Sequence, residues 1–287
     1  MIDLTNISLI KSLLKIDNSS PDRRMGQNFL ISSKSLERIS NSTELEGQTV
    51  LEIGTGLGVL TQELCKKAKR VISVEKDERM YNIAKDVLIF DNLTLLNEDI
   101  LDFEVEKYIS GEFKIVANIP YQITSPIIRK FLPNKNLTEM ILLMQKEVAE
   151  RICAKPGSSK RGYLTLVCEF YSDPSILFGI SKNCFWPSPK VDSSVVKFKV
   201  PLRQSPERRV YEDINAHKVD EKELFRIVQA GFSSKRKQLL NSLSAGLRCD
   251  KSEIENILNK VNIIPTRRAE TLTLEEWCLI TKKIPVN

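Results

Sequence analysis

The chain has 287 residues, of which 41% are hydrophobic and 28% are charged, and its formal net charge is +6. This composition is typical of a globular protein of one or two domains, and it excludes collagen-like, intrinsically disordered and disulfide-scaffold classes. A chain of this length buries about three quarters of its unfolded surface, so folding requires neither a disulfide nor a metal. The excess of positive charge permits a polyanionic partner without demonstrating one.

The sequence carries no signal for export, membrane insertion or metal binding. No apolar run approaches the roughly 20 residues that a membrane helix needs. The six cysteines are scattered without a CxxC pair, which is typical of free thiols in a reducing compartment. The only histidine, His217, has no evident partner, which argues against a metal site and a histidine-based triad. We expect a cytoplasmic protein with no bound metal.

Strands and helices alternate through the first two thirds of the chain. Seven β-branched or apolar runs are predicted to be strands, at residues 49–54, 70–75, 93–99, 113–121, 139–145, 174–181 and 193–200. Helical spacing separates most of them, which indicates βαβ units and a parallel sheet. No helix separates the last two runs, so we expect them to form an antiparallel pair at one edge. The predicted fold class is α/β, Rossmann-like, with a mostly parallel seven-stranded sheet.

The pattern changes to helices alone after about residue 200. Apolar residues recur at helical spacing over 224–243, and further helices are predicted over 250–261 and 271–283. The last of these opens with a capping box formed by Thr273 and Glu276. We therefore expect two domains, an α/β domain over 1–200 with an N-terminal arm over 1–25, and a small all-helical domain over 201–287.

A glycine-rich turn follows the first predicted strand, in the stretch EIGTGLG from Glu52 to Gly58. Glycines such as Gly54 remove the β-carbons that would keep a nucleotide away from the backbone. Glu75 ends the second strand, where a carboxylate can accept hydrogen bonds from both ribose hydroxyls. Asp99, at the end of the third strand, can accept from an adenine amino group.

Two ligands fit this pattern, S-adenosylmethionine and a dinucleotide. The spacing G-x-G-x-G departs from the dinucleotide fingerprint G-x-G-x-x-G. A carboxylate at Glu52 would oppose a pyrophosphate and suit a sulfonium, which favours S-adenosylmethionine. A turn whose glycines only pack a helix against the sheet remains the structural alternative.

The fourth strand runs into Asn118-Ile119-Pro120-Tyr121, which we expect to lie beside the cofactor. The lone pair of an amine on an aromatic ring, such as N6 of adenine, is delocalised. Two acceptors out of the ring plane, the side-chain oxygen of Asn118 and the backbone carbonyl of Ile119, would favour a pyramidal nitrogen that points at a methyl donor. Tyr121 offers an aromatic face for a base. Phe185, in the stiff segment Phe-Trp-Pro-Ser-Pro, is a candidate opposite wall for a flipped base or, alternatively, a buried loop aromatic.

These residues belong to a longer series of motifs that resembles the ribosomal RNA adenine dimethyltransferase family, in particular its bacterial small-subunit branch. The resemblance runs from about residue 22 to residue 282 and is specific because many motifs agree in order. The motifs are QNFL (27–30), EIGTGLG (52–58), VEKD (74–77), NED (97–99), NIPY (118–121), the segment 142–166, FWPSPKVDSSVV (185–196), FSSKRKQLLNSL (232–243) and RAETLTLEEW (268–277).

The resemblance implies transfer of four methyl groups from S-adenosylmethionine to N6 of two adjacent adenosines in a hairpin loop near the 3′ end of 16S ribosomal RNA. The implied substrate is the pre-30S particle, bound by a protein that we expect to be a monomer. The residues implied to bind the cofactor are Asn28, Leu30, Gly54, Glu75, Asp99 and Asn118, and those implied to act on the target base are Asn118, Tyr121 and Phe185. Basic clusters around Arg23 and Lys235 become candidates for gripping RNA, which makes 201–287 an expected RNA- or ribosome-binding domain.

Three positions depart from the family pattern: Met25, Thr55 in place of the usual proline, and Ile119 in place of the small-subunit branch's leucine. Isoleucine at the last position is typical of relatives that methylate 23S ribosomal RNA and confer macrolide resistance, so that branch stays an alternative. Two further functions stay open, those of a nicotinamide-dependent oxidoreductase and of a non-catalytic ribosome-assembly factor. The oxidoreductase would need a hydride-transfer partner that the sequence lacks. A non-catalytic assembly factor would not require the NIPY motif, so the intact motif argues against that function.

Overall fold

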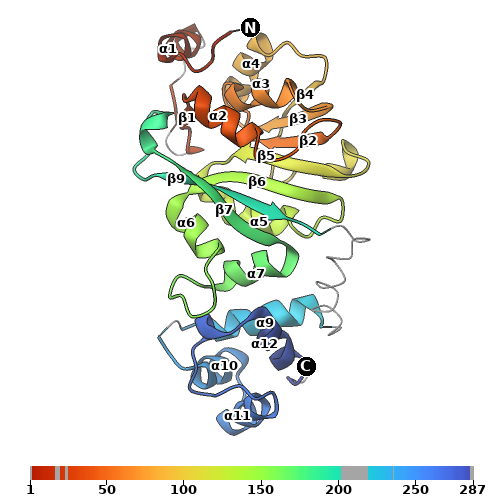
Figure 1. Cartoon of the computed structure of the whole chain (residues 1–287), viewed down its shortest axis with the longest axis vertical. Coiled ribbons are helices and arrows are strands. Elements are labelled where there is room, and N and C mark those ends of the chain that lie inside the picture. The colour runs from red at the N-terminus through yellow and green to blue at the C-terminus, as the bar shows by residue number, and fades with distance from the viewer. Residues whose placement is uncertain (1, 17–19, 23–24, 202–218, 235, 285–287) are drawn as a thin grey trace. The chain divides into compact units, whose positions relative to one another are not determined.

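The computed structural model describes residues 2–16, 20–22, 25–201, 219–234 and 236–284 (Figure 1). The chain divides into two compact units, Met1–Ala149 with Asp173–Val200, and Glu150–Ser172 with Pro201–Asn287. The segment 150–172 thus groups with the helical unit, whereas the sequence analysis assigned it to the α/β domain. His217 lies outside the described residues.

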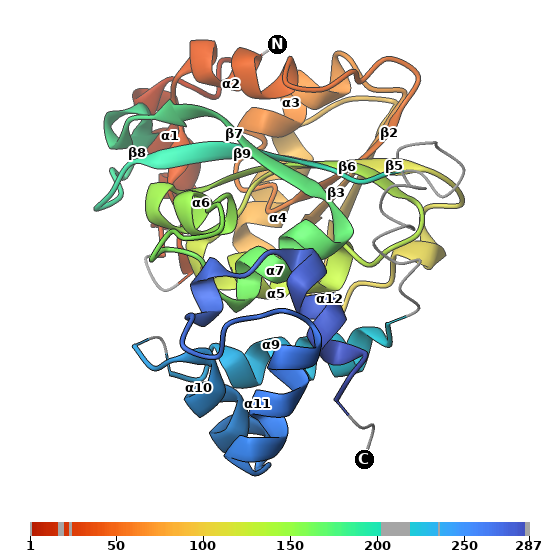
Figure 2. The same ribbon diagram turned by 60° about the horizontal axis from the view of Figure 1, so that its bottom comes forward.

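The first unit is built on a mixed seven-stranded sheet with the order β4-β3-β2-β5-β6-β9-β7. Its strands are β2 (Thr49–Ile53), β3 (Arg70–Glu75), β4 (Leu93–Asn97), β5 (Phe113–Asn118), β6 (Leu137–Gln145), β7 (Asp173–Ile180) and β9 (Ser193–Lys199). The pairs from β4 to β6 are parallel, and β9 is antiparallel to both β6 and β7. The predicted antiparallel edge pair is confirmed, and Figure 2 shows β6, β9 and β7 side by side.

The central strands are apolar because both faces of the sheet are covered. Four of the five residues of β2 and five of the six of β3 are buried, as expected for a parallel sheet with helices on both sides. In Figure 2, α2 and α3 lie on one side of the sheet and α5 on the other. The helices of this unit are α1 (Ile7–Ile16), α2 (Ser33–Ser40), α3 (Val59–Cys65), α4 (Glu78–Val87) and α5 (Thr124–Phe131), and α6 (Lys146–Ile152) leads into the second unit.

Single turns and a short ribbon complete the first unit. The strands β1 (Phe29–Leu30) and β8 (Phe185–Trp186) form a separate antiparallel pair. The 3₁₀ turns are Val105–Lys107, Tyr121–Ile123 and Lys182–Cys184. The strand order reverses between β2 and β5: β3 and β4 follow on one side of β2, and β5 lies on the other. Open α/β sheets bind ligands at such a switch point, at the carboxyl ends of the strands.

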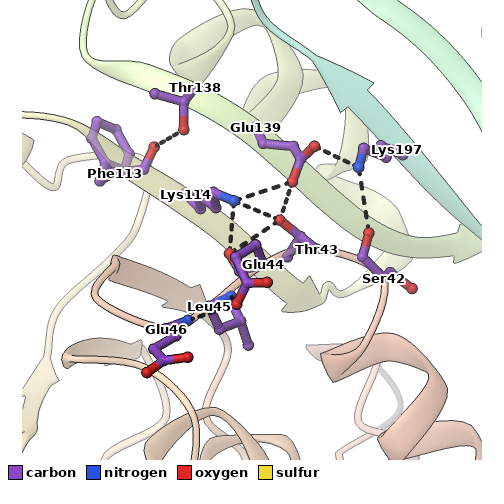
Figure 3. A network of polar contacts seen from close by, with 10 residues as sticks. All are labelled: Ser42, Thr43, Glu44, Leu45, Glu46, Phe113, Lys114, Thr138, Glu139 and Lys197. Carbon is purple, nitrogen blue, oxygen red and sulfur yellow. Dashed lines mark hydrogen bonds and ion pairs between the residues drawn. The ribbon is translucent and has the colours of Figure 1, made fainter.

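A polar network fastens the segment between α2 and β2 to the amino-terminal ends of β5 and β6 (Figure 3). Glu139 of β6 forms ion pairs with Lys197 at 2.5 Å and Lys114 at 3.6 Å, and it accepts a hydrogen bond from Thr43. Lys114 also donates to the backbone carbonyl of Glu44 at 2.7 Å. This network lies at the amino-terminal ends of the parallel strands, away from their carboxyl ends.

The described residues of the second unit form helices joined by turns and loops, with no strand among them. It contains α7 (Tyr163–Tyr171), α9 (Glu221–Gly231), α10 (Leu239–Leu247), α11 (Lys251–Lys260) and α12 (Leu274–Thr281), with a 3₁₀ turn at Ala269–Thr271. The capping box of Thr273 and Glu276 is confirmed. Among the described segments, no helix is long and apolar enough to cross a membrane.

The single helix predicted over 224–243 is wrong, because α9 ends at Gly231 and α10 begins at Leu239. A β-carbon at Gly231 would lie 2.3 Å from the ring of the fully buried Trp277, so the chain passes closely against α12 there. The Leu239 N–H then donates to the Arg267 carbonyl at 2.7 Å. These tertiary contacts lie at the two sides of the break between α9 and α10.

Candidate functional site

A cavity of about 530 Å³ lies in the first unit, at the carboxyl ends of β2, β3, β4 and β5. Its volume is in the range of small-molecule and cofactor sites. Seven of the residues predicted from the sequence line it together, namely Asn28, Leu30, Gly54, Glu75, Asp99, Asn118 and Tyr121. They come from five separate segments of the chain.

The glycine turn serves both the cavity and the packing of the sheet. Gly54 has a φ of 78°, and a β-carbon there would meet nothing closer than Pro120 at 3.7 Å, so its surface is open toward the cavity. Gly58 has a φ of 85°, and a β-carbon there would lie 2.6 Å from Leu88. Gly54 therefore fits the predicted role under a ligand, whereas Gly58 is required by helix packing.

Glu75 supports the glycine turn and faces the same cavity. Its two carboxylate oxygens accept hydrogen bonds from the Gly56 N–H at 2.7 Å and the Asp77 N–H at 2.8 Å. Burial raises the pKa of Glu75 despite these hydrogen bonds. Each oxygen keeps a second lone pair, so the carboxylate can also accept from two neighbouring hydroxyls.

Asp99 also lines the cavity, two residues after the end of β4. It accepts from Lys76 Nζ at 2.6 Å and from the Leu101 N–H at 2.9 Å. Partial burial acts to raise the pKa of Asp99, but the bonds from Lys76 and Leu101 outweigh it and hold the pKa below its usual value. Asp99 is therefore a carboxylate at neutral pH, as an acceptor for an amino group must be.

Asn118 ends β5 and lies next to the segment that carries Asn28. Its side-chain nitrogen donates a long hydrogen bond of 3.5 Å to the Asn28 carbonyl, while Asn28 donates to the Gly26 carbonyl at 3.0 Å. The amide nitrogen thereby faces Asn28, so the side-chain oxygen of Asn118 faces away from that carbonyl. The acceptor that methyl transfer to an amine would need is thus turned away from Asn28.

Gln27 is a site residue that the sequence analysis missed. It donates to Asp77 Oδ2 at 2.7 Å, and its own side-chain oxygen accepts from the Asp22 N–H at 2.7 Å. Asp77 also caps α4 and forms an ion pair with Arg79 at 2.6 Å. Gln27 therefore ties the segment leading to Asn28 to the end of β3. The only signal in the sequence is its place in the QNFL motif.

The two predicted aromatic walls lie in different environments. Tyr121 lines the cavity, whereas Phe185 does not. Phe185 is 3% exposed, pairs with Leu30 across the β1–β8 ribbon and packs in the hydrophobic core. The structure thus places Phe185 as the buried loop aromatic that the sequence left open as an alternative, and it does not bring Phe185 and Tyr121 together in one cavity wall.

Glu52 does not supply the cavity with the negative charge that the sequence analysis assigned to it. It is 1% exposed and does not line the cavity, because its Oε2 is turned toward the hydroxyls of Thr61 and Ser73, each at 2.6 Å. Burial raises the pKa of Glu52 to about 8, so the group is mostly uncharged at neutral pH. Thr55 extends this network with a hydroxyl 2.5 Å from that of Ser73, a contact that the usual proline would lack.

Replacing Glu52 with Gln should change the pH dependence of stability. Glu52 has a pKa of about 8 in the folded chain and 4.5 as its ordinary value, so the folded state binds the extra proton between these pH values. The free energy of unfolding of the wild type should therefore fall between pH 5 and 8, by up to about 1.4 kcal/mol per pH unit from this group. Glutamine does not titrate, so denaturant titrations should show Glu52→Gln gaining on the wild type across this window. Parallel curves would contradict the buried, protonated state.

Comparisons with known proteins agree with the fold and identify the family. The family model described as ribosomal RNA adenine dimethylase matches residues 18–280. The Ribosomal RNA small subunit methyltransferase A of Caldanaerobacter subterraneus is 41% identical over 89% of this chain and 94% of its own length. The protein of the same name from a Geobacillus strain is 34% identical over 98% of both chains.

Two solved structures resemble this one over most of its length. A dimethyladenosine transferase from Plasmodium falciparum is 25% identical with a TM-score of 0.70, covering 87% of this chain and 94% of its own. The 23S rRNA methyltransferase ErmE is also 25% identical, with a TM-score of 0.63, over 89% of this chain and 99% of its own. The match of the family model and the curated relatives extends over nearly the whole chain. The chain therefore belongs to the ribosomal RNA adenine dimethylase family.

Proposed function

We propose that this protein transfers four methyl groups from S-adenosylmethionine to N6 of two adjacent adenosines in a hairpin loop near the 3′ end of 16S ribosomal RNA, within the pre-30S particle. The observation that carries the proposal is that one cavity is lined both by the residues predicted to bind the cofactor and by the NIPY segment. The names of the curated relatives, Ribosomal RNA small subunit methyltransferase A, support the choice of the small subunit.

We propose that S-adenosylmethionine occupies the cavity along the carboxyl ends of the strands. Glu75 would accept from its ribose hydroxyls and Asp99 from its adenine amino group, with Gly54 beneath it. Asn28 and Leu30 would contact it from the segment that Gln27 fastens. The support is that these groups line one cavity and that their acceptors fit those donors. We propose no metal.

The chemistry that we propose at Asn118 requires no strong base. The Asn118 side-chain oxygen and the Ile119 backbone carbonyl would accept from the two N–H groups of the target amine. Both groups are set by the end of β5 and by Pro120, so they need not reorganise during the reaction. Acceptors of this kind favour a pyramidal nitrogen whose lone pair points at the methyl group.

The alternative substrate is 23S ribosomal RNA. The likeness to ErmE supports this alternative less well than the likeness to the small-subunit relatives supports 16S ribosomal RNA. The small-subunit relatives are 34–41% identical, against 25% for ErmE. A methyl-transfer assay with labelled S-adenosylmethionine on undermethylated 30S and on 50S subunits separates the two. We expect label as N6,N6-dimethyladenosine at adjacent small-subunit adenosines. Label on 50S alone would replace our proposal with the alternative.

We propose that the helical unit contributes to RNA binding through exposed basic residues, Arg236 and Lys237 among them. The remaining basic residues of the predicted clusters, Arg23, Arg24 and Lys235, lie outside the described residues. The proposed setting is a monomer in the cytoplasm, where ribosomal subunits assemble. The six cysteines are all free thiols, which agrees with a reducing compartment.

Replacing both Arg236 and Lys237 with Ala should weaken binding to the pre-30S particle and make it less sensitive to salt. Each lost phosphate contact reduces the slope of log K against log salt by roughly 0.7–0.9. Binding measured at several salt concentrations gives this slope. The control replaces Lys251 and Lys260, which are also exposed and lie on α11, and should leave the slope nearer to that of the wild type. Equal slopes for both double variants would remove Arg236 and Lys237 from the proposed interface.

A further inference from the structure

Tyr121 is held both at its backbone and at its side-chain hydroxyl. Its backbone follows Pro120, whose φ is −57°, and its carbonyl accepts from the Thr124 hydroxyl at 3.1 Å. Its phenol oxygen lies 2.7 Å from Ser193 Oγ, on a strand 72 residues further along the chain. A ring anchored at the backbone and at the hydroxyl has little freedom to tilt.

Ser193 is a rigid anchor. It is the first residue of β9, its exposure is 0%, and it pairs with Gln145 at the end of β6 and with Ile180 at the end of β7. A residue paired on both sides within a sheet can move only if the sheet moves. The Tyr121 hydroxyl is therefore bonded to a group whose position is held by the sheet.

The contact also decides which part of Tyr121 is available for chemistry. The hydroxyl is engaged by Ser193, and burial raises the pKa of Tyr121, so the phenol stays protonated and does not serve as a base. Tyr121 lines the cavity, and with its hydroxyl bonded to Ser193 the part of its side chain that is left to contact a ligand is the ring. A ring face without an available hydroxyl suits stacking on a planar base.

We propose that Ser193 is a positioning residue for methyl transfer, whose hydrogen bond orients the ring of Tyr121 so that its face receives the target adenine. This inference rests on the proposed function and, within it, on the role predicted from the sequence for Tyr121, whose ring would stack on the target base. It adds to that function a specific division of labour: Tyr121 contributes its ring, and Ser193 sets the angle of that ring.

The test compares Ser193→Ala, Tyr121→Phe and the double variant in methyl transfer to undermethylated 30S subunits. Each single change removes the same hydrogen bond and keeps the ring. We expect kcat to fall about three- to tenfold in each, the range for the loss of one neutral hydrogen bond, with no further loss in the double variant. Affinity for S-adenosylmethionine should be unchanged. Ser194→Ala is the matched control, because Ser194 is also buried but faces the other side of the sheet.

The ratio of monomethylated to dimethylated adenosine gives a second readout. A tilted ring presents the amine less accurately for each transfer, so Ser193→Ala and Tyr121→Phe should raise the share of N6-methyladenosine, and Ser194→Ala should not. Wild-type kcat and product ratio in Ser193→Ala would overturn the inference, as would losses that add in the double variant or a parallel loss of cofactor affinity. Full activity in Tyr121→Ala would instead contradict the predicted stacking of Tyr121 on the base and leave the rest of the proposed function standing.

Discussion

Asn118→Ala is expected to lower the rate of methyl transfer by about a hundred- to a thousandfold, the usual effect of removing one preorganised polar group from a reacting centre. The proposed role of this residue is realised as the amine becomes pyramidal, so the loss should fall on kcat. The fold should survive, because the hydrogen bond that the side chain gives up is a long one of 3.5 Å. Single-turnover transfer from labelled S-adenosylmethionine to 30S subunits measures the effect.

Asn118→Asp is the matched variant, because it keeps an acceptor oxygen at the same place. It should retain more activity than Asn118→Ala, although its second oxygen would face the Asn28 carbonyl, to which the native amide donates. An unchanged rate in Asn118→Ala would mean that this side chain does not bind the amine. If the alanine variant lost transfer yet still supported subunit assembly in cells, an assembly role would stand beside the enzymatic one.

Glu75→Gln is expected to weaken the binding of S-adenosylmethionine about ten- to a hundredfold, since hydrogen bonds to a charged group contribute roughly 1.5–3 kcal/mol. Glutamine has one acceptor oxygen, so it cannot accept from both the Gly56 and the Asp77 N–H groups as Glu75 does. The glycine turn would lose a support at the same time as the ligand loses a partner. Titration calorimetry with S-adenosylmethionine measures the affinity, and kcat at saturating cofactor should change little.

The pH dependence of this affinity has a defined sign. The carboxylate is the form that accepts from two hydroxyls, and burial raises the pKa of Glu75 above its ordinary value. Affinity in the wild type should therefore fall as the pH is lowered through that raised pKa, and this contribution should be missing in Glu75→Gln. Glu98→Gln is the control, because Glu98 lines the same cavity but accepts from the Tyr108 hydroxyl instead of the glycine turn. Equal losses in the two variants would contradict a special role for Glu75.

Much of the first unit could be predicted from the sequence, because the patterns that indicate its strands and helices lie within short stretches of the chain. Strands buried on both faces are continuous apolar runs, and the polar residues Glu75 and Asn118 stand where such runs end. In a parallel sheet the carboxyl ends of neighbouring strands meet at one edge, so the order of strands along the chain was enough to bring these residues together. The capping box of α12 is equally local, since its two residues are three positions apart.

Errors and omissions arose where distant segments meet. The apolar spacing over 224–243 is helical, whereas the chain breaks between α9 and α10, where Gly231 meets Trp277 and Leu239 bonds to Arg267. Gln27 and Asp77 are 50 residues apart, so nothing local indicates their hydrogen bond. The same holds for Tyr121 and Ser193.

The sequence by itself determined which groups stand at the ends of the strands, and through them the family and its chemistry. Only the tertiary structure decided which of those groups are exposed to the cavity and which are charged. Glu52 is adjacent in sequence to the cavity-lining Ile53 but is turned into the core and protonated, and Phe185 is buried in the hydrophobic core. Burial and ionisation depend on everything that packs around a side chain, and that environment comes from segments far away in the chain.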